Sequence, residues 1–527
     1  MKGSIIYQHY LLTLLLVLLI GCSLEEKILD ESTGTELLEQ ADIELNIMAP
    51  AYGVLTGLYG CCSIFQINEI TTDESIVPAK GLDWFDGGSY IRLHTHNWSP
   101  SNGVGGWGAM EGGIARANSG LFLLLERADL LDPNELRSFQ AELRFLRAFY
   151  RYHLLDWFRQ VPMRDELDQN FNEPPPVFNN IEAFDWLVEE LETIIPDLKD
   201  HGDITYGRIT KQAAYTLLAK LFLNAEVYTG TPKWAECIDA CNAVIGSGKF
   251  ALSDDYFQLF SYDNDENNPE AIFVIRQSFE TNNKVFFTPS FVLHYSQNLG
   301  RNAITFNGYA TTEEFFFKWD QDNDPMNGVQ TTDIRFQDDR ILASTGTNLG
   351  FLEGPQFHPD GSPIQDPQRS FMDSTFVQLD YTPEISNISN ALQHEGVRVM
   401  KYEPDPEGNI FFLGRNDTQV FRYADVWLMK AEALFRTQQA GAFEMVNELR
   451  MKRGVPPLMN LTEQLLLDER GFELYWEGHR RQDLVRFGQF TSGTWAFKEV
   501  SEEHKNVFPI DESLLNINEN LVQNPGY

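Results

Sequence analysis

Apolar residues recur every three or four positions along much of the chain, which is the spacing of one face of an α-helix. The clearest case begins at Asp132-Pro133, where an N-capping side chain precedes a proline at the first helical position. The apolar stripe and the arginines that flank it are Leu136, Phe139, Leu143, Leu146, Tyr150, Leu154 and Trp157, with Arg137, Arg144, Arg147 and Arg151. The pattern predicts a helix over 132–157 that packs among other helices and carries a cationic flank.

The same periodicity predicts further helices over residues 46–59, 181–198, 210–228, 231–245, 421–434 and 442–452. Consecutive amphipathic helices joined by short turns are typical of tetratricopeptide-type hairpins, although no clean repeat of about 34 residues is present. Between 250 and 420 the pattern changes, because short aromatic and β-branched runs such as 271–275 alternate with Asn, Asp, Gly and Pro clusters. We expect a mainly α protein with an irregular, loop-rich lobe that carries short strands.

The last quarter of the chain combines a helical pattern with dense charge. Residues 461–488 are predicted as one helix, with Leu461, Leu465, Phe472 and Trp476 on its apolar stripe. Glu469, Glu473, Glu477 and Arg480 line up beside that stripe. Paired carboxylates are compatible with acid/base catalysis, but Arg480, Arg481 and Arg486 on the same segment favour a structural ion-pair lattice.

This segment resembles the C-terminal region of the SusD/RagB family, through the pattern Glu-x-x-x-Glu-Gly-x-Arg-x-x-Asp-Leu-x-Arg-Phe-Gly that starts at Glu473. Residues 421–434, 508–511 and 518–527 are also similar to segments of that family. The resemblance implies a single SusD-like domain over 46–527. Its parts would be an N-terminal helical part (46–249), an irregular ligand-side lobe (250–420) and a C-terminal helical part (421–527).

The same resemblance implies a non-catalytic surface lipoprotein that binds a glycan or oligosaccharide and hands it to a SusC-like TonB-dependent porin. The porin would dock on the helical hairpins. Two other functions remain open from the sequence. A RagB-like relative would bind peptides, and a glycoside hydrolase would need two carboxylates about 5–10 Å apart, which an acidic chain could supply.

The N-terminus predicts export and lipidation. Lys2 precedes an apolar run over 11–20, which is too short to span a bilayer and indicates a signal peptide over 1–21. Residues 19–22, Leu-Ile-Gly-Cys, resemble a lipobox whose Cys22 is lipidated, although Ile20 is bulkier than usual there. Residues 22–45 would form a polar tether, and the acidic stretch after Cys22 resembles signals that send lipoproteins to the exterior face of the outer membrane.

Composition narrows the ligand class. The 527 residues include 77 acidic and 40 basic side chains, for a net charge of −37, which argues against nucleic acid as a ligand. No nucleophile elbow, zinc-protease motif, phosphate loop or dinucleotide motif occurs, so neither a cofactor nor a metal is expected. Asp320, Asp322 and Asp324 start like a calcium loop, but Pro325 occupies the position that requires glycine.

Of the cysteines after Cys22, the adjacent pair 61–62 and Cys237 with Cys241 are expected to be buried thiols.

The candidate ligand site lies in a loop rich in Gly, Asp and Trp. Trp84 offers a flat face for stacking on a sugar ring, and Asp73 and Asp83 offer hydrogen-bond acceptors for its hydroxyl groups. Burial of Trp84 as a loop anchor is the competing role. Trp98 and Trp107 are expected to be packing residues.

Three further candidates come from the irregular lobe. Tyr309 and Trp319 are chosen by their position in the lobe. Arg398 lies in a segment that resembles one entering the core of the family from the ligand side, and it could bridge two hydroxyls or simply pair with an acid.

Overall fold

The computed structural model describes residues 43–60, 64–168, 170, 172–279, 289–322 and 327–527. Contacts divide the chain into Met1–Asn46 and Ile47–Tyr527. The first unit contributes only the start of α3 (Ile43–Gly60) to the described residues, and the second unit contains all the other described elements. The signal peptide over 1–21, Cys22, nearly all of the tether, residues 61–62 and Asp324 lie outside the described residues.

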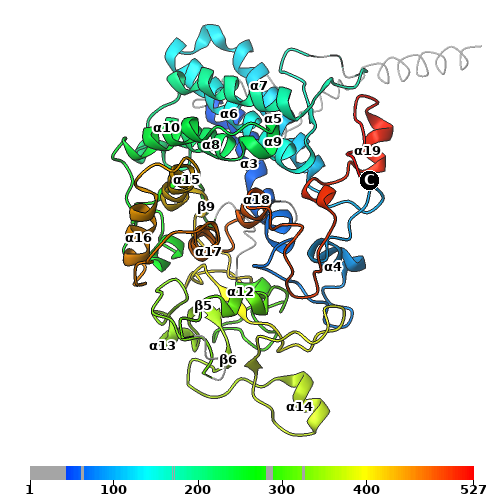
Figure 1. Ribbon diagram of the computed structural model, residues 1–527, viewed down its shortest axis with the longest axis vertical. Coiled ribbons are helices and arrows are strands. Elements are labelled where there is room, and N and C mark those ends of the chain that lie inside the picture. The colour runs from blue at the N-terminus through cyan, green and yellow to red at the C-terminus, as the bar shows by residue number, and fades with distance from the viewer. Residues whose placement is uncertain (1–42, 61–63, 169, 171, 280–288, 323–326) are drawn as a thin grey trace, which may run out of the picture. The chain divides into compact units, whose positions relative to one another are not determined.

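The N-terminal part of the second unit is helical, as the apolar periodicity predicts. Figure 1 shows all of its helices except the first, α4 (Ser89–His94), gathered at one end of this unit. The gathered helices are α5 (Trp107–Glu126), α6 (Pro133–Phe158), α7 (Asn180–Ile194), α8 (Lys211–Leu223), α9 (Ala225–Thr229) and α10 (Trp234–Ile245). The Asp132 side chain caps α6 by accepting hydrogen bonds from the backbone N–H groups of Asn134 and Glu135, at 2.8 and 3.2 Å. Helix α6 packs against both α5 and α7.

Two predictions for this part were wrong in detail. The helix expected over 210–228 is interrupted at Asn224, between α8 and α9. Helix α5 was not predicted at all, because the five glycines over 106–120 weigh against a helix in isolation. The structure confirms the packing role of Trp98 and Trp107, which are buried, and shows Cys237 and Cys241 as buried free thiols.

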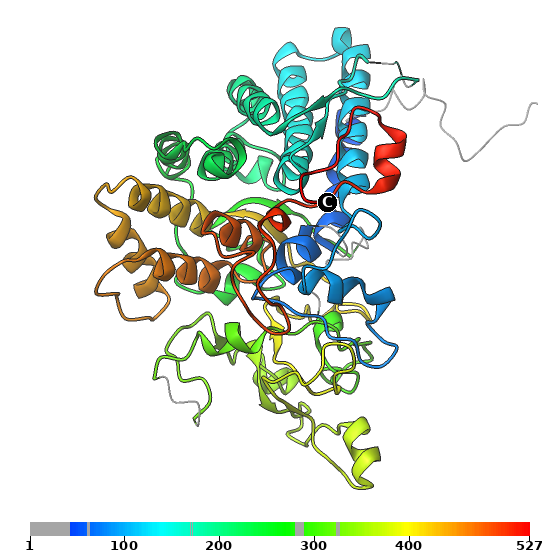
Figure 2. The ribbon, with the colours of Figure 1, turned by 45° about the vertical axis from the view of Figure 1, so that its right-hand side comes forward.

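The lobe between 250 and 420 is irregular, with short strands, as predicted. Figures 1 and 2 place its helices α12–α14 at the opposite end of the unit from α5–α10. The lobe's helices are α11 (Pro289–Val292), α12 (Glu313–Phe317), α13 (Leu342–Thr345) and α14 (Pro367–Asp373). The strands of the whole unit lie in small antiparallel sheets, and all of them except β1 and β2 belong to the lobe or its border. They are β1 (Val161–Pro162), β2 (Val177–Phe178), β3 (Ala271–Ile275), β4 (Gln337–Asp338), β5 (Leu349–Leu352), β6 (Gly354–Pro355), β7 (Asp380–Tyr381), β8 (Arg398–Met400) and β9 (Thr418–Arg422).

The C-terminal part returns to helices, and α15 to α18 lie between these two ends, whereas α19 lies toward the end that holds α5–α10 (Figures 1 and 2). They are α15 (Tyr423–Arg436), α16 (Ala442–Lys452), α17 (Glu463–Leu474), α18 (Arg480–Arg486) and α19 (Glu512–Ile517). Strand β9, which pairs with β3, leads directly into α15. Shorter turns of other helix types are η1 (Gln66–Ile70), η2 (Asp86–Gly88), η3 (Ala128–Leu130), η4 (Ile195–Asp197), η5 (Asp203–Thr205), η6 (Phe257–Phe260) and η7 (Glu503–Asn506).

The single helix predicted over 461–488 is wrong, because the chain breaks between α17 and α18. Trp476 and Gly478 have φ angles of 58° and 84°, which a helix cannot accommodate. The Trp476 backbone N–H donates to the Glu74 carboxylate at 3.2 Å, and the Gly478 N–H donates to the Glu69 carboxylate. Hydrogen bonds to a segment some 400 residues away in sequence thus replace the helical ones. The buried apolar side chains of α17 are Leu466, Leu467 and Leu474 rather than Leu461 and Leu465.

The predicted ion-pair lattice is confirmed. Glu473 is fully buried and accepts hydrogen bonds from three guanidinium groups, those of Arg335, Arg422 and Arg453, at 2.7–3.0 Å. Glu469, one turn earlier on α17, and Glu477, in the break after α17, are also buried and paired. The acids of this segment therefore hold α17 to strand β9 and to the irregular lobe.

The two glutamates at the break predict a pH dependence of stability. Burial, reinforced by Asp73 and opposed by Arg480, raises the pKa of Glu74 to about 7, and burial beside Glu74 also raises the pKa of Glu69. Between the ordinary pKa of 4.5 and about 7 the folded chain therefore binds more protons than the unfolded chain. We expect the free energy of unfolding to fall as pH rises from about 5 to about 8, with Glu74 contributing on the order of 1–3 kcal/mol.

Urea unfolding at several pH values checks this prediction on the parent chain and on Glu74→Gln, which keeps the shape of the side chain but cannot ionise. The variant should lose less stability over this pH range. Glu192→Gln, at an exposed position of α7, is the matched control and should follow the parent. An equally steep decline in Glu74→Gln would show that other groups cause the pH dependence.

Candidate functional site

Trp84 is presented at the surface by a strained turn. Its φ angle is 59°, in the left-handed region that side chains rarely adopt, and the ring is only partly buried. The indole N–H donates to the Phe306 carbonyl at 2.5 Å, and the ring lies against the backbone of Gly308. A Cβ atom at Gly308 would come within 2.3 Å of the ring, so glycine is required there for Trp84 to hold this position.

Trp84 belongs to a connected series of partly exposed aromatic side chains, which we call the aromatic arc. Its members are Tyr90, Trp84, Phe291, Phe306 and Phe411. Successive ring centroids are 5.7, 6.3, 5.5 and 6.0 Å apart, within the range of direct aromatic contact. The arc combines the segment around α4 with α11, the loop that follows α11, and the loop around Phe411.

Polar groups border the arc. Asp83 is exposed and accepts a hydrogen bond from the hydroxyl of Tyr295, which is also exposed. Burial and the neighbouring Asp83 carboxylate raise the pKa of Tyr295, so its hydroxyl stays protonated and remains a donor. Arg92 donates to the Gly87 carbonyl at 2.6 Å and thereby fixes the turn between Trp84 and α4. The site thus offers flat apolar faces beside a few fixed acceptors and donors.

Arg398 lies behind the arc and contacts no solvent. It donates to the Asn307 side chain at 2.6 and 3.2 Å and to backbone carbonyls of 393–396. Its guanidinium also stacks on the Tyr381 ring at 4.6 Å. Within the described residues it forms no ion pair with an acid, so the alternative of acid pairing is wrong. Because Asn307 precedes Gly308, Arg398 supports the backbone on which Trp84 rests.

The other predicted site residues are buried. Tyr309 is inaccessible to solvent, and its ring centroid lies 5.7 Å from that of Trp84, on the inner side of the arc. Trp319 is 3% exposed and packs among Phe336, Phe351, Phe472 and Tyr475. Asp73 is 6% exposed and pairs with Arg480 at 2.7 Å and with Lys318 at 3.1 Å. Burial therefore assigns these three residues to packing and ion pairing in the structure.

Sequence reasoning missed most of the arc. Tyr90, Phe291, Tyr295, Phe306 and Phe411 follow no periodic pattern, and each stands in a polar, turn-rich segment. Large aromatic residues between turn residues are hard to bury, and this signal identified Trp84. The same signal holds for Tyr and Phe, and it could have identified these five residues. Hydrogen bonds between distant loops, such as that of Trp84 with Phe306, bring these residues together.

Two further searches of the described residues bear on the site. In the residues that the structure describes, no group of three His, Cys, Asp or Glu side chains could hold a metal ion. No helix in the described segments is long and apolar enough to cross a membrane.

Comparison with known proteins places the chain in a family. The sequence profile described as the SusD family matches residues 242–527. The starch-binding protein SusD of Bacteroides thetaiotaomicron is 30% identical over 512 residues, which cover 88% of this chain and 85% of the relative. SusD-like protein P25 of Formosa agariphila is 24% identical over 378 residues, covering 66% and 63%.

Solved structures agree on the fold. A SusD superfamily protein from Parabacteroides distasonis superposes with a TM-score of 0.70 at 20% identity, covering 94% of this chain and all of that chain. Surface glycan-binding protein A from Bacteroides thetaiotaomicron, solved with laminarihexaose, gives 0.67 at 17% identity, covering 91% and 99%. These likenesses confirm the predicted mainly helical SusD-like fold with short scattered strands. Together with the sequence matches, they establish that the chain belongs to the SusD family.

Proposed function

We propose that this chain is a cell-surface glycan-binding lipoprotein whose aromatic arc is the binding platform. The observation that carries the proposal is the partly exposed series of rings around Trp84, held in a strained turn. Relatives include a starch-binding protein and a laminarin-binding one, so glucans are the first ligand class to test.

In the proposed mode of binding, sugar rings lie with their C–H faces on the arc and their hydroxyls toward its polar border. Trp84 supplies the largest face, and Asp83 and Tyr295 accept from and donate to hydroxyl groups. Arg398 and Tyr309 support Trp84 from behind, while Asp73 and Trp319 fix the surrounding fold. Proteins of this family are binding proteins, not enzymes, so the glycoside hydrolase alternative is set aside.

We further propose that Cys22 carries a lipid that anchors the chain in the outer membrane, facing the exterior. The lipobox-like residues 19–22 support this. A SusC-like TonB-dependent porin would receive the ligand and dock on the helical hairpins, and the family resemblance supports this partner. Binding without turnover is consistent with transfer to a transporter.

Replacement of Trp84 by alanine tests the platform. We expect Trp84→Ala to weaken binding of a glucan oligosaccharide roughly 10-fold or more, because loss of one stacked ring costs about 1–3 kcal/mol. Calorimetric titration of the chain from Ser23 onward against starch- and laminarin-derived oligosaccharides, then against plant, host and microbial polysaccharides, measures this. Product analysis of the same mixtures should show no hydrolysis.

Phe371→Ala is the matched control, since Phe371 of α14 is 86% exposed and lies outside the arc. Gly308→Ala is a second test, because its Cβ atom would displace the Trp84 ring without removing it, and binding should fall as in Trp84→Ala. Binding that survives both changes would remove the arc as the platform. Retention of peptides instead of every glycan tested would favour the RagB-like alternative.

A further inference from the structure

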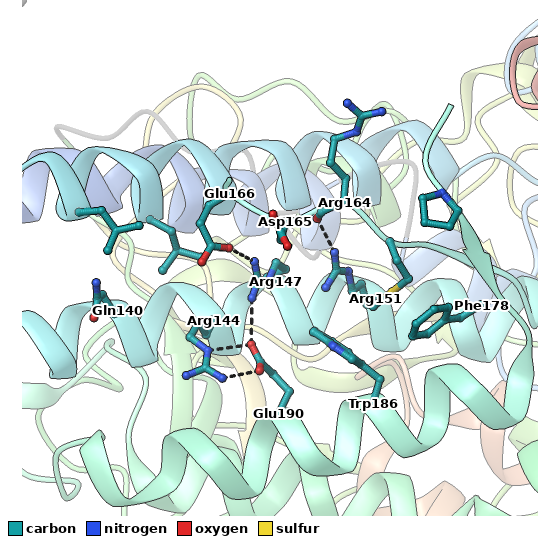
Figure 3. Close-up of a pocket in the computed structure, with 14 residues that line it drawn as sticks. Gln140, Arg144, Arg147, Arg151, Arg164, Asp165, Glu166, Phe178, Trp186 and Glu190 are labelled. Atoms are coloured by element: carbon teal, nitrogen blue, oxygen red, sulfur yellow. Dashed lines mark hydrogen bonds and ion pairs between the residues drawn. The ribbon is translucent and has the colours of Figure 1, made fainter. Parts of the chain in front are cut away.

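Apart from the aromatic arc, the structure contains a pocket of about 640 Å³ among α5, α6, α7 and the segment that joins β1 to β2. It shares no residue with the aromatic arc. Figure 3 shows Arg144, Arg147 and Arg151 in a row along α6, with Glu190 and Trp186 of α7 on one side. The opposite wall is partly apolar. Its volume falls within the range of small-molecule sites.

Two of the three arginines form ion pairs with carboxylates. Arg144 forms a two-pronged ion pair with Glu190 at 2.9 and 2.5 Å. Arg147 pairs with the same Glu190 at 3.0 Å and with Glu166 at 2.5 Å. Their charges are therefore balanced within the pocket wall, and neither needs a ligand.

Arg151 differs from its neighbours because it has no acidic partner. It is 2% exposed, and its Nη2 donates to the Arg164 carbonyl at 2.6 Å. Its Nε, like that of Arg147, has no hydrogen-bond partner. Unlike Arg144 and Arg147, Arg151 forms no ion pair with a carboxylate in the described part of the chain. The guanidinium stacks on the Trp186 ring at 4.5 Å, which orients it but does not neutralise it. An unpaired buried charge of this kind is costly, so the fold retains it at the expense of stability.

The acids near Arg151, namely Glu111, Glu190 and Asp165, offset its charge only in part, and none of them forms an ion pair with it. Glu111 of α5 acts on it at longer range but forms no ion pair with it, and burial raises the pKa of Glu111 to about 7. Asp165 accepts hydrogen bonds from the backbone of Leu167 and Asp168 at 3.0 Å, which ties it to its own turn. Burial and the nearby Arg147 lower the pKa of Arg151 to about 9, so it still carries a positive charge at neutral pH.

We propose that this pocket binds the carboxylate of a small organic acid of sugar size, such as a uronic acid, with Arg151 as the anchor. A guanidinium offers a planar fork that matches a carboxylate. Trp186 holds that fork in place, and the apolar side chains of Leu121, Met163 and Phe178 would contact the carbon skeleton of the ligand. A bare inorganic anion would leave this apolar wall uncovered. The inference does not depend on the glycan site around Trp84.

Calorimetric titration of the full-length chain tests the proposal with three probes: D-glucuronate, D-glucose and inorganic sulfate. We expect glucuronate to bind, glucose not to bind, and sulfate to bind more weakly than glucuronate. Arg151→Met should weaken glucuronate binding roughly 10-fold or more, the loss expected for a hydrogen-bonded charge pair. Arg137→Gln, on the same helix but in an exposed ion pair outside the pocket, is the matched control and should bind as the parent does.

Thermal unfolding provides a second readout that a merely structural arginine would not give. Ligand-free Arg151→Met should unfold at the same or a higher temperature than the parent, because it removes an unpaired buried charge. Glucuronate should raise the unfolding temperature of the parent and of Trp84→Ala but not of Arg151→Met. Should Arg151→Met fail to fold, Trp186→Leu should weaken glucuronate binding in its place.

Three results would overturn the proposal: no binding of glucuronate, binding that Arg151→Met or its substitute leaves unchanged, or equal binding of glucose. Sulfate that binds as tightly as glucuronate would overturn the assignment to an organic acid. Loss of glucan binding in Trp84→Ala with glucuronate binding intact would show that the two sites are independent.

Discussion

Replacing Glu473 by glutamine is expected to lower the free energy of unfolding by about 3–5 kcal/mol, the largest effect of any single change considered for this chain. The carboxylate of Glu473 has no exposed surface and accepts from Arg335, Arg422 and Arg453. Each of these guanidinium groups is itself at most 1% exposed. Removing the charge would leave three buried cations short of a partner that water cannot replace.

The pKa of Glu473 shows that the fold favours the charged form. Burial alone would raise it, but Arg453, Arg422 and Arg335 together hold it well below the usual range. The ion pairs therefore contribute stability at neutral pH that is lost progressively as the pH falls below the ordinary pKa of 4.5 toward the depressed pKa. This is the opposite direction to Glu74, whose raised pKa makes the fold less stable as pH rises.

Urea unfolding at pH 7 measures the effect of Glu473→Gln. Glu236→Gln is the matched control, because Glu236 pairs with Lys233 at 2.9 Å but both side chains are more than 40% exposed. An exposed pair is expected to contribute less than about 1 kcal/mol. Losses of similar size in the two variants would mean that the buried lattice is not a main source of stability.

The sequence predicted those features of the fold that depend on local pattern. The cap at Asp132 and the apolar stripe of α6 are both present, because each is set within a few residues. The acids and arginines of 469–486 were correctly interpreted as an ion-pair lattice, since their number on one segment left few other ways to bury them. The partners Arg335 and Arg422 could not be foreseen, because they come from distant parts of the chain.

What the sequence could not supply is long-range geometry. The break at Trp476 depends on hydrogen bonds to Glu74 and Glu69, and nothing in residues 461–488 signals it apart from Gly478. At the site, Trp84 was identified from its loop, and its partial exposure is compatible with that interpretation. Arg398 was predicted to contact the ligand, but its side chain is buried and bonds to Asn307, which lies 91 residues away and could not be foreseen.

Helix α5 shows how tertiary packing can reverse a local preference. Gly113 and Gly120 lower the intrinsic tendency of this segment to form a helix. In the structure they lie where α5 approaches α6, and side-chain atoms of Tyr150 and Leu143 fill the space that a Cβ atom would need. The glycines that hide the helix in the sequence therefore permit the close contact that stabilises it.

Substitutions along α5 should separate these two effects. Gly113→Val is expected to lower the free energy of unfolding by roughly 3 kcal/mol or more, because its Cβ atom alone would lie 2.5 Å from the Tyr150 ring. Gly112→Ala is the matched control one residue earlier, where the nearest atom is the movable end of Arg116 at 3.2 Å. That variant should gain up to about 1 kcal/mol from helix propensity.

Urea unfolding of both variants, with helix content followed by circular dichroism, measures the two effects. Because both positions lie on one helix, intrinsic propensity alone would favour either substitution over glycine, and only the contact with α6 gives the two changes opposite signs. A stabilised or unchanged Gly113→Val would mean that α5 and α6 do not pack at this distance. The pocket around Arg151 would then need revision as well, since its walls include residues of both helices.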